Sequence, residues 1–338
     1  MTANPNAALN DTALAVRYDD VAEAADRIRD LVVETPLIEA HSLSEAIQGR
    51  FFVKAENLQS TGSFKLRGAM NSLASLRPDE RTHGVVAYSS GNHAQGVAAA
   101  ARHFGVNATI IMPADAPTIK KANTIELGAK VVTYDRYSES REDLGHQIQA
   151  DTGAVLVPPY DFAPTIAGQG TSGIEVTNQL RARGLGLDLA IICCGGGGLA
   201  AGSGLALKTA FPESHLWVAE PETHDDTARS LLSGTHVYND PDARSICDAI
   251  VTPTPGVLPL PILLACGAAG RSASDEEVLD AVAFAAKRLK LVVEPGGAIA
   301  LAVARKYVNE MRGKTVVAYL SGGNIDPEMM ETAMGREV

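Results

Sequence analysis

The sequence has few cysteines and few aromatic residues, and it contains no long apolar run. Its 338 residues include four cysteines, one tryptophan and only 5% aromatic side chains. Cys193, Cys194, Cys247 and Cys266 form no CxxC pair and no zinc-ligand spacing. Cys193 and Cys194 are adjacent in an apolar run, where we expect buried structural thiols. No run approaches the ~18 apolar residues of a membrane span, which predicts no membrane partner.

Basic side chains are also scarce relative to acidic ones. The chain carries 29 Lys and Arg against 40 Asp and Glu, for a formal net charge of −11. Because no long basic run is present, we expect no nucleic-acid partner. The first 20 residues lack a basic segment followed by a continuous apolar stretch, so we expect no secretory signal and a cytoplasmic location.

Short apolar runs alternate with Ala-rich helical patterns after a polar arm over residues 1–17. Strands are expected at 85–90, 108–113, 129–134, 154–159, 189–194, 215–220, 291–294 and 315–323. Helices are expected at 93–105, 119–128, 138–153 and 296–308, with a Gly/Ala-rich helix after residue 194. This alternation is typical of βαβ units, and it predicts parallel sheets in two α/β domains.

One chemically suggestive segment is STGSFKLRGA at residues 60–69, which places Lys65 at a predicted loop-to-helix entry. A lysine there suits a Schiff-base role, for which its amine must be partly deprotonated. Burial or a cationic neighbour would lower its pKa, and Arg67 is a candidate for that neighbour. The alternative is a helix cap with a surface lysine, and the segment alone favours it.

A second segment, SSGNHAQG at 89–96, follows a predicted strand and opens a predicted helix. Exposed backbone N–H groups and the helix dipole at such a position favour a carboxylate or phosphate. The serine, asparagine and histidine side chains add donors and a proton carrier. A tight turn with an N-cap is an equally good interpretation of this segment alone.

Two Gly-rich segments follow later strands. CGGGGLAAG at 194–202 lies between a strand and a helix, where four glycines allow the backbone to wrap a phosphate closely. Its alternatives are a flexible turn or a dinucleotide fingerprint with Glu220 at the ribose, which would leave Lys65 unexplained. In SGGNID at 321–326, Ser321 could offer its hydroxyl to a ring nitrogen, although the segment alone favours a Gly-rich turn.

In combination, these segments resemble the fold-type-II pyridoxal-phosphate family of threonine dehydratase, serine dehydratase and serine racemase. SFKLRGA, SSGNHAQG, AGQGT (167–171), CGGGG, EPGGA (294–298) and SGGN stand in the family's order over residues 30–328, with EPGGA replacing the usual EPSGA. The resemblance implies two open, twisted parallel-sheet domains, tryptophan-synthase-β-like, with the cofactor in the interdomain cleft. A large domain would comprise 1–80 and 162–338, and a small inserted domain 81–161.

The resemblance also implies pyridoxal 5′-phosphate as the cofactor, held by the amine of Lys65. Phe64 would pack on its ring, Asn92 would bind its phenolic oxygen and Ser321 would meet its pyridine nitrogen. Its phosphate would be bound by the backbone amides of Gly195, Gly196, Gly197, Gly198 and Leu199.

The same resemblance assigns the substrate side of the site. The α-carboxylate would be held by Ser89, Ser90, Asn92 and His93. Lys65 would take the α-proton, and Ser90 matches the second acid/base of the racemases. SESRE at 138–142 resembles a segment of serine racemases and 3-hydroxyaspartate dehydratases, which implies that Arg141 binds a second substrate carboxylate bidentately. The alternative for Arg141 is a solvated charge on a helix.

A metal site is implied by AEPETHDD at 219–226, which resembles the divalent-cation site of the racemase-like subgroup. Glu220, Asp226 and the carbonyl of His224 would be the ligands, and such oxygens suit Mg²⁺ or Ca²⁺, with Mn²⁺ a further candidate. The alternative is an acidic surface turn. A metal-binding Glu220 could not easily also bind a ribose.

The expected activity is α,β-elimination of a β-hydroxy amino acid to a 2-oxo or imino acid, with loss of water and ammonia. The substrate candidates are 3-hydroxyaspartate, serine and threonine, and Arg141 favours the first. Serine racemase and catabolic threonine dehydratase are the closest alternatives. A nicotinamide-dependent oxidoreductase and a non-catalytic amino-acid-binding module are more distant, and Lys65 argues against the latter. By resemblance we also expect a homodimer without a C-terminal regulatory domain.

Overall fold

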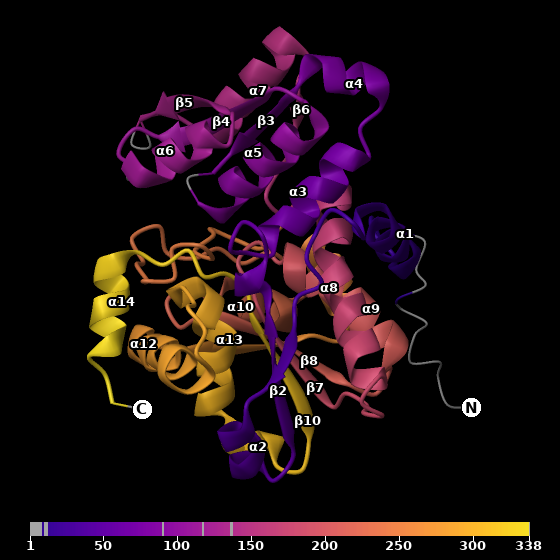
Figure 1. Cartoon of the computed structure of the whole chain (residues 1–338), viewed down its shortest axis with the longest axis vertical. Helices are drawn as coiled ribbons and strands as arrows, with labels where there is room; N and C mark the ends of the chain where they lie inside the picture. Colours follow the sequence, from indigo (N-terminus) through magenta and orange to yellow (C-terminus); the bar gives the residue numbers. More distant parts are fainter. Residues whose placement is uncertain (1–8, 10–12, 90, 117, 136–137, 338) are drawn as a thin grey trace.

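The structure, a computed structural model, describes residues 9, 13–89, 91–116, 118–135 and 138–337. Within these residues, the strands form a six-stranded and a four-stranded sheet, and Figure 1 shows the smaller sheet and its helices above the larger one. Neighbouring strands are parallel, except that β1 (Leu37–Glu39) runs antiparallel to β2 (Arg50–Ala55). The α/β class with parallel sheets is therefore confirmed.

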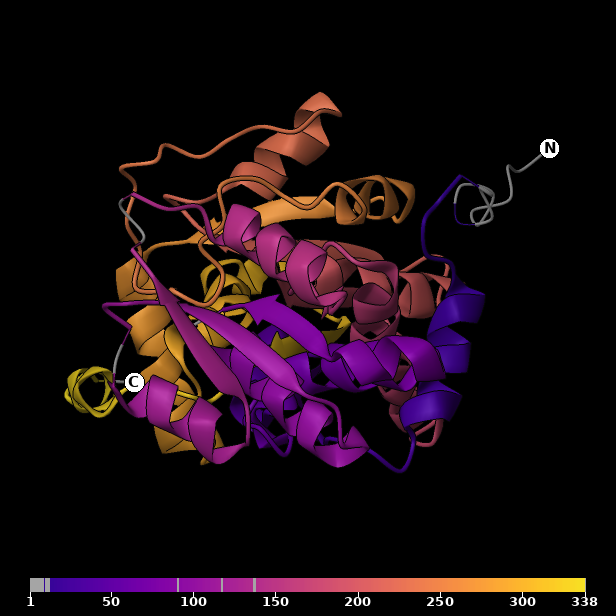
Figure 2. The ribbon, with the colours of Figure 1, turned by 90° about the horizontal axis from the view of Figure 1, so that it is seen from above.

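The large sheet has the strand order β1–β2–β10–β7–β8–β9, so its centre pairs segments from both ends of the chain. Its remaining strands are β7 (Leu189–Cys193), β8 (His215–Pro221), β9 (Ala269–Ala273) and β10 (Thr315–Leu320). All five residues of β7 are buried, as expected of a parallel strand covered on both faces. Figures 1 and 2 show α14 and α1 on opposite sides of the molecule.

Most helices outside the small-sheet region pack on this large sheet or on one another. Their bounds are α1 (Tyr18–Ile28), α2 (His41–Ile47), α3 (Lys65–Ala74), α8 (Ala163–Arg181), α9 (Gly198–Ala210), α10 (Asp226–Ser233), α11 (Pro259–Ala265), α12 (Asp275–Phe284), α13 (Pro295–Lys306) and α14 (Pro327–Met334). Three shorter helical segments are η2 (Glu56–Leu58), η3 (Ala285–Leu289) and η4 (Val308–Met311). Helix α3 lies between α8 and the small-sheet helix α5 (Asn92–Phe104). In Figure 1, α12, α13 and α14 lie on one side of the sheet and α8, α9 and α1 on the other.

The small sheet has the order β5–β4–β3–β6 and a hydrophobic core of its own. Its strands are β3 (Val85–Tyr88), β4 (Ala108–Pro113), β5 (Lys130–Tyr134) and β6 (Val155–Leu156). Its helices are α4 (Pro78–His83), α5 (Asn92–Phe104), α6 (Thr118–Glu126) and α7 (Arg141–Thr152). We propose that residues 81–161, which contain all of these strands, form the small inserted domain, and that 1–80 and 162–338 form the large one.

The close packing of α8 on α9 positions the start of α9, where the glycine loop ends. A Cβ at Gly202 of α9 would lie 2.3 Å from the carbonyl oxygen of Ile166 in α8. A Cβ at Gly170 of α8 would lie 2.7 Å from the backbone of Gly202. Only glycines permit this backbone approach. Gly170, the second glycine of the AGQGT segment, thus sets the distance between two helices.

The expected strand at 291–294 is wrong. The N–H of Leu291 bonds to Ala285 at the end of a helix, and the carbonyl of Val292 accepts from the Asn57 side chain. The N–H of Glu294 bonds to Gly322 in a loop. With their backbone groups used in this way, these residues link η3 to α13 without pairing to a strand.

Other differences concern strand edges and lengths. The expected strand at 154–159 is reduced to the two residues of β6, and β1, β2 and β9 were not expected. The described helices include none with the length and apolar character needed to cross a membrane. All four cysteines are buried and unpaired, which includes Cys193 and Cys194, for which burial was expected.

Candidate active site

A cavity brings together nearly all the residues that the sequence motifs indicated for a cofactor and a substrate. It is lined by residues following β3, β6, β7 and β10 and by the start of α3, α5 and α7. The sequence-predicted residues that line it are Phe64, Lys65, Ser89, Asn92, His93, Arg141, Gly195, Gly196, Gly197, Gly198, Leu199 and Ser321. Ser90 lies outside the described residues. This is the place where parallel sheets bind ligands, beyond the carboxyl ends of their strands.

Lys65 is the first residue of α3, and its half-buried side chain lies in the cavity wall. Nζ donates a hydrogen bond of 2.9 Å to the carbonyl oxygen of Pro159 and lies 5.0 Å from the centre of the Phe64 ring. Burial lowers the pKa of Lys65 to about 8, although Cys193 and Glu294 oppose this shift. An amine with this pKa is available as a nucleophile near neutral pH.

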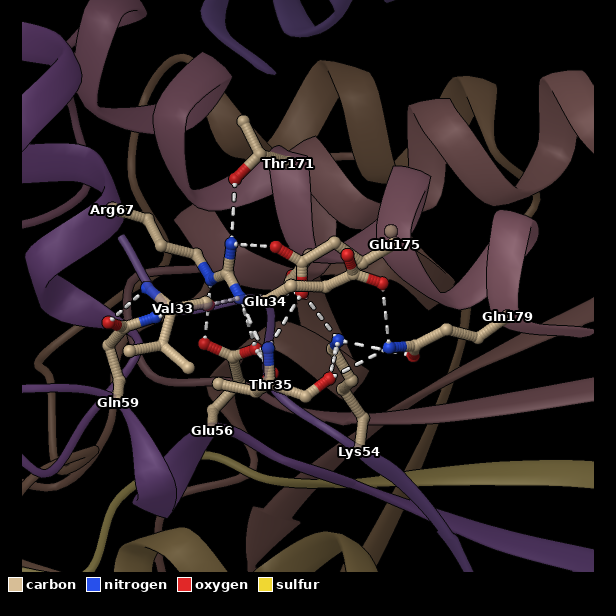
Figure 3. A network of polar contacts seen from close by, with 12 residues as sticks. Val33, Glu34, Thr35, Lys54, Glu56, Gln59, Arg67, Thr171, Glu175 and Gln179 are labelled. Carbon is tan, nitrogen blue, oxygen red and sulfur yellow. Dashed lines mark hydrogen bonds and ion pairs between the residues drawn. The ribbon is translucent and has the colours of Figure 1, made fainter. Parts of the chain in front are cut away.

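Arg67 does not have the role that we expected from the sequence. Burial, rather than a nearby guanidinium, lowers the pKa of Lys65. Arg67 is fully buried between Glu56 and Glu175 and makes two hydrogen bonds to each carboxylate, at 2.6–2.9 Å (Figure 3). Lys54 donates to the same Glu175 at 2.5 Å. The guanidinium of Arg67 therefore anchors α3 to Glu56 and Glu175, and it does not prepare the amine of Lys65 for chemistry.

The glycine loop between β7 and α9 has no space for side chains. A Cβ at Gly196 would lie 2.2 Å from the ring of Tyr160, and one at Gly198 would lie 2.5 Å from Oε1 of Gln169. Gly197 has a φ of 91°, a conformation that favours glycine. The loop leads into the N-terminus of α9, where unpaired backbone N–H groups and the helix dipole favour an anion. These features fit a phosphate group.

His93 is buried and electrically neutral. Its Nε2 lies 2.8 Å from the carbonyl oxygen of Val157, to which it must donate, so Nδ1 is an acceptor. Burial and the proximity of Lys65 lower the pKa of His93 to about 3. A neutral acceptor does not attract a carboxylate, so these surroundings do not favour the predicted role of His93 in binding one.

Ser89 and Ser321 lie at the ends of β3 and β10, on the cavity wall. The Ser89 hydroxyl accepts a 3.2 Å hydrogen bond from the N–H of Gly91. Ser321 is buried, and its carbonyl oxygen accepts from the N–H of Phe64 at 3.1 Å. This bond joins the end of β10 to the residue before Lys65, so that the Ser321 hydroxyl and the lysine amine share one cavity.

Arg141 begins α7 and reaches the same cavity from the small-sheet side. Its guanidinium lies over the ring of Tyr88, 5.4 Å from the centre, and Nε bonds to Glu142 at 2.7 Å. The side chain remains 41% exposed. A planar cation that is held against an aromatic ring at the edge of a cavity can bind a carboxylate bidentately.

The residues predicted to bind a metal lie outside this cavity. Both carboxylate oxygens of Glu220 accept backbone N–H groups, from Thr227 at 2.9 Å and Ala228 at 2.8 Å. Burial and the nearby Asp226 raise the pKa of Glu220, and burial raises the pKa of Asp226 to about 6. The described residues contain no group of three or more His, Cys, Asp or Glu that could hold a metal. The metal stays a prediction.

Several cavity residues were missed in the sequence. Glu294 and Gln169 stand inside the EPGGA and AGQGT motifs, which could have indicated them. Tyr88 is the last residue of β3, and Tyr160 lies in the loop that follows β6. A position beyond the carboxyl end of a strand is itself a signal in parallel sheets. Asn324 also lines the cavity, three residues after Ser321.

Comparison with known proteins agrees with this geometry. Residues 28–322 match the family model "Pyridoxal-phosphate dependent enzyme". The chain is 39% identical to L-threo-3-hydroxyaspartate ammonia-lyase of Saccharomyces cerevisiae (95% of this chain, 97% of that one) and 37% identical to serine racemase of Schizosaccharomyces pombe (95% and 98%). The solved structure of serine racemase from Dictyostelium discoideum is similar, with a TM-score of 0.84 and 34% identity (92% and 99%). The chain therefore belongs to the family of pyridoxal-phosphate-dependent enzymes.

Proposed function

We propose that this enzyme is a pyridoxal-phosphate-dependent dehydratase (ammonia-lyase) acting on a β-hydroxy amino acid, with 3-hydroxyaspartate as the preferred substrate. The observation that carries the proposal is one cavity lined by Lys65, the glycine loop and the side chain of Arg141. The relatives named for 3-hydroxyaspartate, serine and threonine support this substrate class.

The residues of the cavity fit the cofactor. Lys65 would hold its aldehyde carbon, Phe64 would pack on its ring, Asn92 would donate to its ring oxygen, and the Ser321 hydroxyl would face its ring nitrogen. Its phosphate would lie on the backbone amides of Gly195, Gly196, Gly197, Gly198 and Leu199, in a loop with no room for side chains. When bound, the cofactor supplies an electron sink for negative charge that develops at the substrate's α-carbon.

The protein's own groups would move the protons. The amine of Lys65 would accept the α-proton, and its pKa of about 8 suits this role near neutral pH. The carbonyl oxygen of Pro159 keeps the amine in place by accepting one of its N–H groups. Ser90, which would be needed on the opposite side for racemisation, remains a candidate from sequence alone. Of the residues expected to hold the α-carboxylate, Ser89 remains a candidate, Asn92 would be engaged by the ring oxygen, and the surroundings of His93 do not favour that role.

Arg141 would select the substrate through its second carboxylate. Threonine offers only a methyl group at that position and would leave the guanidinium with Glu142 alone. Serine is smaller still and would make no contact with Arg141. Loss of a bidentate charged partner is the kind of difference by which a site discriminates strongly between similar substrates.

Initial rates of 2-oxo acid and ammonia release would test the proposal. We would compare the four 3-hydroxyaspartate stereoisomers, both serine enantiomers and threonine, using wild type, Arg141→Ala and the exposed-arginine control Arg77→Ala. The proposal requires a preference for one 3-hydroxyaspartate isomer that Arg141→Ala loses and Arg77→Ala retains, while serine turnover survives in both. A preference for threonine, unaffected by Arg141→Ala, would instead identify a catabolic threonine dehydratase.

Serine racemase is the second candidate function, since the relatives include serine racemases. Chiral analysis of serine after incubation with the holoenzyme would decide it. Interconversion of the enantiomers faster than 2-oxo acid release would make racemisation the main activity. Both candidates would be contradicted if the wild-type protein with added cofactor showed no visible absorption band and its spectrum were the same as that of Lys65→Ala.

We also propose a divalent cation, Mg²⁺ before Ca²⁺ or Mn²⁺, at Glu220, Asp226 and the carbonyl of His224. Oδ2 of Asp226 is buried and has no hydrogen-bond partner among the described residues, which is consistent with a role as a metal ligand. The melting temperature should be higher in Mg²⁺ than in chelator for wild type, and the same in both for Asp226→Asn.

A cytoplasmic homodimer is proposed as well, and sedimentation would establish the oligomeric state.

A further inference from the structure

Three polar side chains form a hydrogen-bonded chain, which we call the asparagine relay, at the cavity wall. Asn324, after β10, donates from Nδ2 to Oδ1 of Asn92 at 2.6 Å. Asn92, the first residue of α5, donates from its own Nδ2 to Oε1 of Glu294 at 2.5 Å. Asn92 belongs to the small-sheet region, whereas Asn324 and Glu294 lie beside the large sheet. The relay therefore joins the two halves of the molecule at the cavity.

The relay fixes which way the Asn92 amide faces. An asparagine amide has one acceptor oxygen and one NH₂ group with two donors, and its two ends are almost equal in shape. Here the oxygen is used by Asn324, and one N–H is used by Glu294. A reversed amide would place its NH₂ against the NH₂ of Asn324 and its oxygen against the Glu294 carboxylate. The second N–H of Asn92 is left as a donor toward the cavity that Asn92 lines.

Two glycines give the relay its space. A Cβ at Gly322 would lie 2.0 Å from Oε1 of Glu294 and 3.1 Å from Nδ2 of Asn92, so any side chain there would disrupt their bond. A Cβ at Gly62, whose φ is 74°, would lie 2.5 Å from Oδ1 of Asn324. Asn324 is held on its other side by a 3.0 Å bond from Nδ2 to the carbonyl oxygen of Thr61. The relay thus explains why glycine occupies position 322 in the SGGN motif and position 62 in the STGSF segment.

We propose that Asn324 and Glu294 are positioning residues that hold Asn92 as a hydrogen-bond donor to the ring oxygen of the cofactor. The inference rests on the proposed function, in which Asn92 contacts that oxygen. Neither positioning residue needs to touch the reacting atoms. Their effect is to exclude the reversed amide, which would present an acceptor to an electron-rich oxygen.

Asn324→Asp is the sharpest variant, because it replaces the donor by an acceptor of the same size. The new carboxylate would face the oxygen of Asn92 and repel it. If the amide then reversed, its oxygen would face the carboxylate of Glu294 instead, so no orientation satisfies both neighbours. Asn57→Asp is the matched control, since Asn57 donates at 3.0 Å to the carbonyl of Val292 nearby. That change removes a hydrogen bond in the same region without altering the bonds of Asn92.

Absorbance titration of the apoenzyme with pyridoxal phosphate is the measurement, with circular dichroism to establish folding. We expect Asn324→Asp to shift the visible absorption maximum of the bound cofactor and to weaken its binding about tenfold, the value of one hydrogen bond. Asn57→Asp should keep the wild-type maximum. Glu294→Gln, which retains an acceptor oxygen, should resemble wild type, whereas Glu294→Ala should resemble Asn324→Asp.

The outcomes separate this inference from the proposed function. A wild-type protein without any visible band would overturn the proposed function. A wild-type band that Asn324→Asp leaves unchanged in position and affinity would overturn the relay alone. If Asn324→Asp does not fold, Asn324→Ala removes the donor without adding a charge and should give a smaller shift of the same kind. An equal shift in Asn57→Asp would mean that any disturbance of packing in this region shifts the absorption maximum, which would also overturn the relay.

Discussion

At the scale of single residues, Lys65 shows how burial alone can prepare an amine for chemistry. The lysine stands at the start of α3 with its amine inside the cavity, where the charged form loses its hydration. The neighbouring carboxylate of Glu294 opposes the resulting fall in pKa without cancelling it. An ordinary lysine would be almost entirely protonated at neutral pH, whereas about a tenth of a group with a pKa near 8 is free at pH 7.

The pH dependence of cofactor capture follows from this pKa. Only the unprotonated amine can attack the aldehyde, so the rate of capture by the apoenzyme should rise with pH and level off above about 8. Stopped-flow absorbance between pH 6.5 and 9.5 would measure it, with Lys65→Ala as the control that captures nothing. A rate that is still rising tenfold per pH unit at pH 9.5 would mean that the pKa is not lowered.

The sequence motifs predicted which residues lie in the cavity better than they predicted which residues each side chain contacts. The order of the motifs indicated Lys65, Ser321 and the glycine loop, all of which line one cavity. The same motifs suggested that Arg67 acts on Lys65, but Arg67 is turned toward Glu56 and Glu175. Glu175 is 108 positions away in the sequence, and nothing in a local pattern shows which carboxylate will meet a given arginine.

At the scale of secondary-structure elements, the buried charges around Arg67 tie α3 to its neighbours. The guanidinium joins η2 through Glu56 and α8 through Glu175, while Lys54 joins β2 to α8 (Figure 3). Every charged group in this network has an opposite partner, as buried ions require. Because Lys65 lies only two residues before Arg67, the network fixes the turn of helix that carries the reactive amine.

Removing Arg67 should therefore destabilise the protein strongly. Arg67→Met fills similar space but leaves the buried Glu56 and the partly buried Glu175 with one cation fewer, so the free energy of unfolding should fall by about 3–5 kcal/mol. Urea denaturation of the apoenzyme measures this change. Arg77→Met is the control: Arg77 pairs with Asp79 and Glu80 on the surface, and its loss should change stability by less than about 0.5 kcal/mol. Equal effects of the two variants would contradict the role given to the network.

At the same scale, the close packing of the glycine loop predicts that a side chain in the loop weakens cofactor binding. Gly196→Ala would force a methyl group into the ring of Tyr160, so the loop or the ring must move and the phosphate site must change shape. We expect cofactor affinity to fall at least tenfold, as measured by absorbance titration. Gly186→Ala is the matched control, because a Cβ there would have no neighbour within 4 Å. Unchanged binding in Gly196→Ala would show that the loop tolerates a side chain.

The elements themselves were largely predictable from the sequence, with informative exceptions. Helix α5 and strands β4, β7 and β10 stand where periodicity and apolar runs place them. The apolar run at 291–294 is no strand, because its backbone groups bond to a helix end, a side chain and a loop. Conversely, β9 is a strand with the sequence AGRSA, and only its pairing with β8 makes it one. Strand identity in these two cases depends on distant neighbours that a local pattern does not contain.

At the scale of the whole molecule, the cavity depends on both halves of the chain. Lys65, the glycine loop and Ser321 come from segments beside the large sheet, while Asn92 and Arg141 begin helices that pack on the small one. A ligand that contacts both sets must hold the two halves together. Its binding free energy then adds to the stability of the complete fold, because neither half alone offers the site.

A dicarboxylate should consequently stabilise the cofactor-loaded enzyme through Arg141. Succinate at a hundredfold excess over its Kd would contribute about 2.7 kcal/mol to the free energy of unfolding, which raises the melting temperature by several degrees. Butyrate has the same length but no second carboxylate for the guanidinium, so it should give a smaller shift. Arg141→Ala should reduce the succinate shift to the butyrate value, and Arg77→Ala should retain it. If succinate stabilises Arg141→Ala as well as wild type, the second carboxylate is bound elsewhere, and the preference for 3-hydroxyaspartate loses its structural basis.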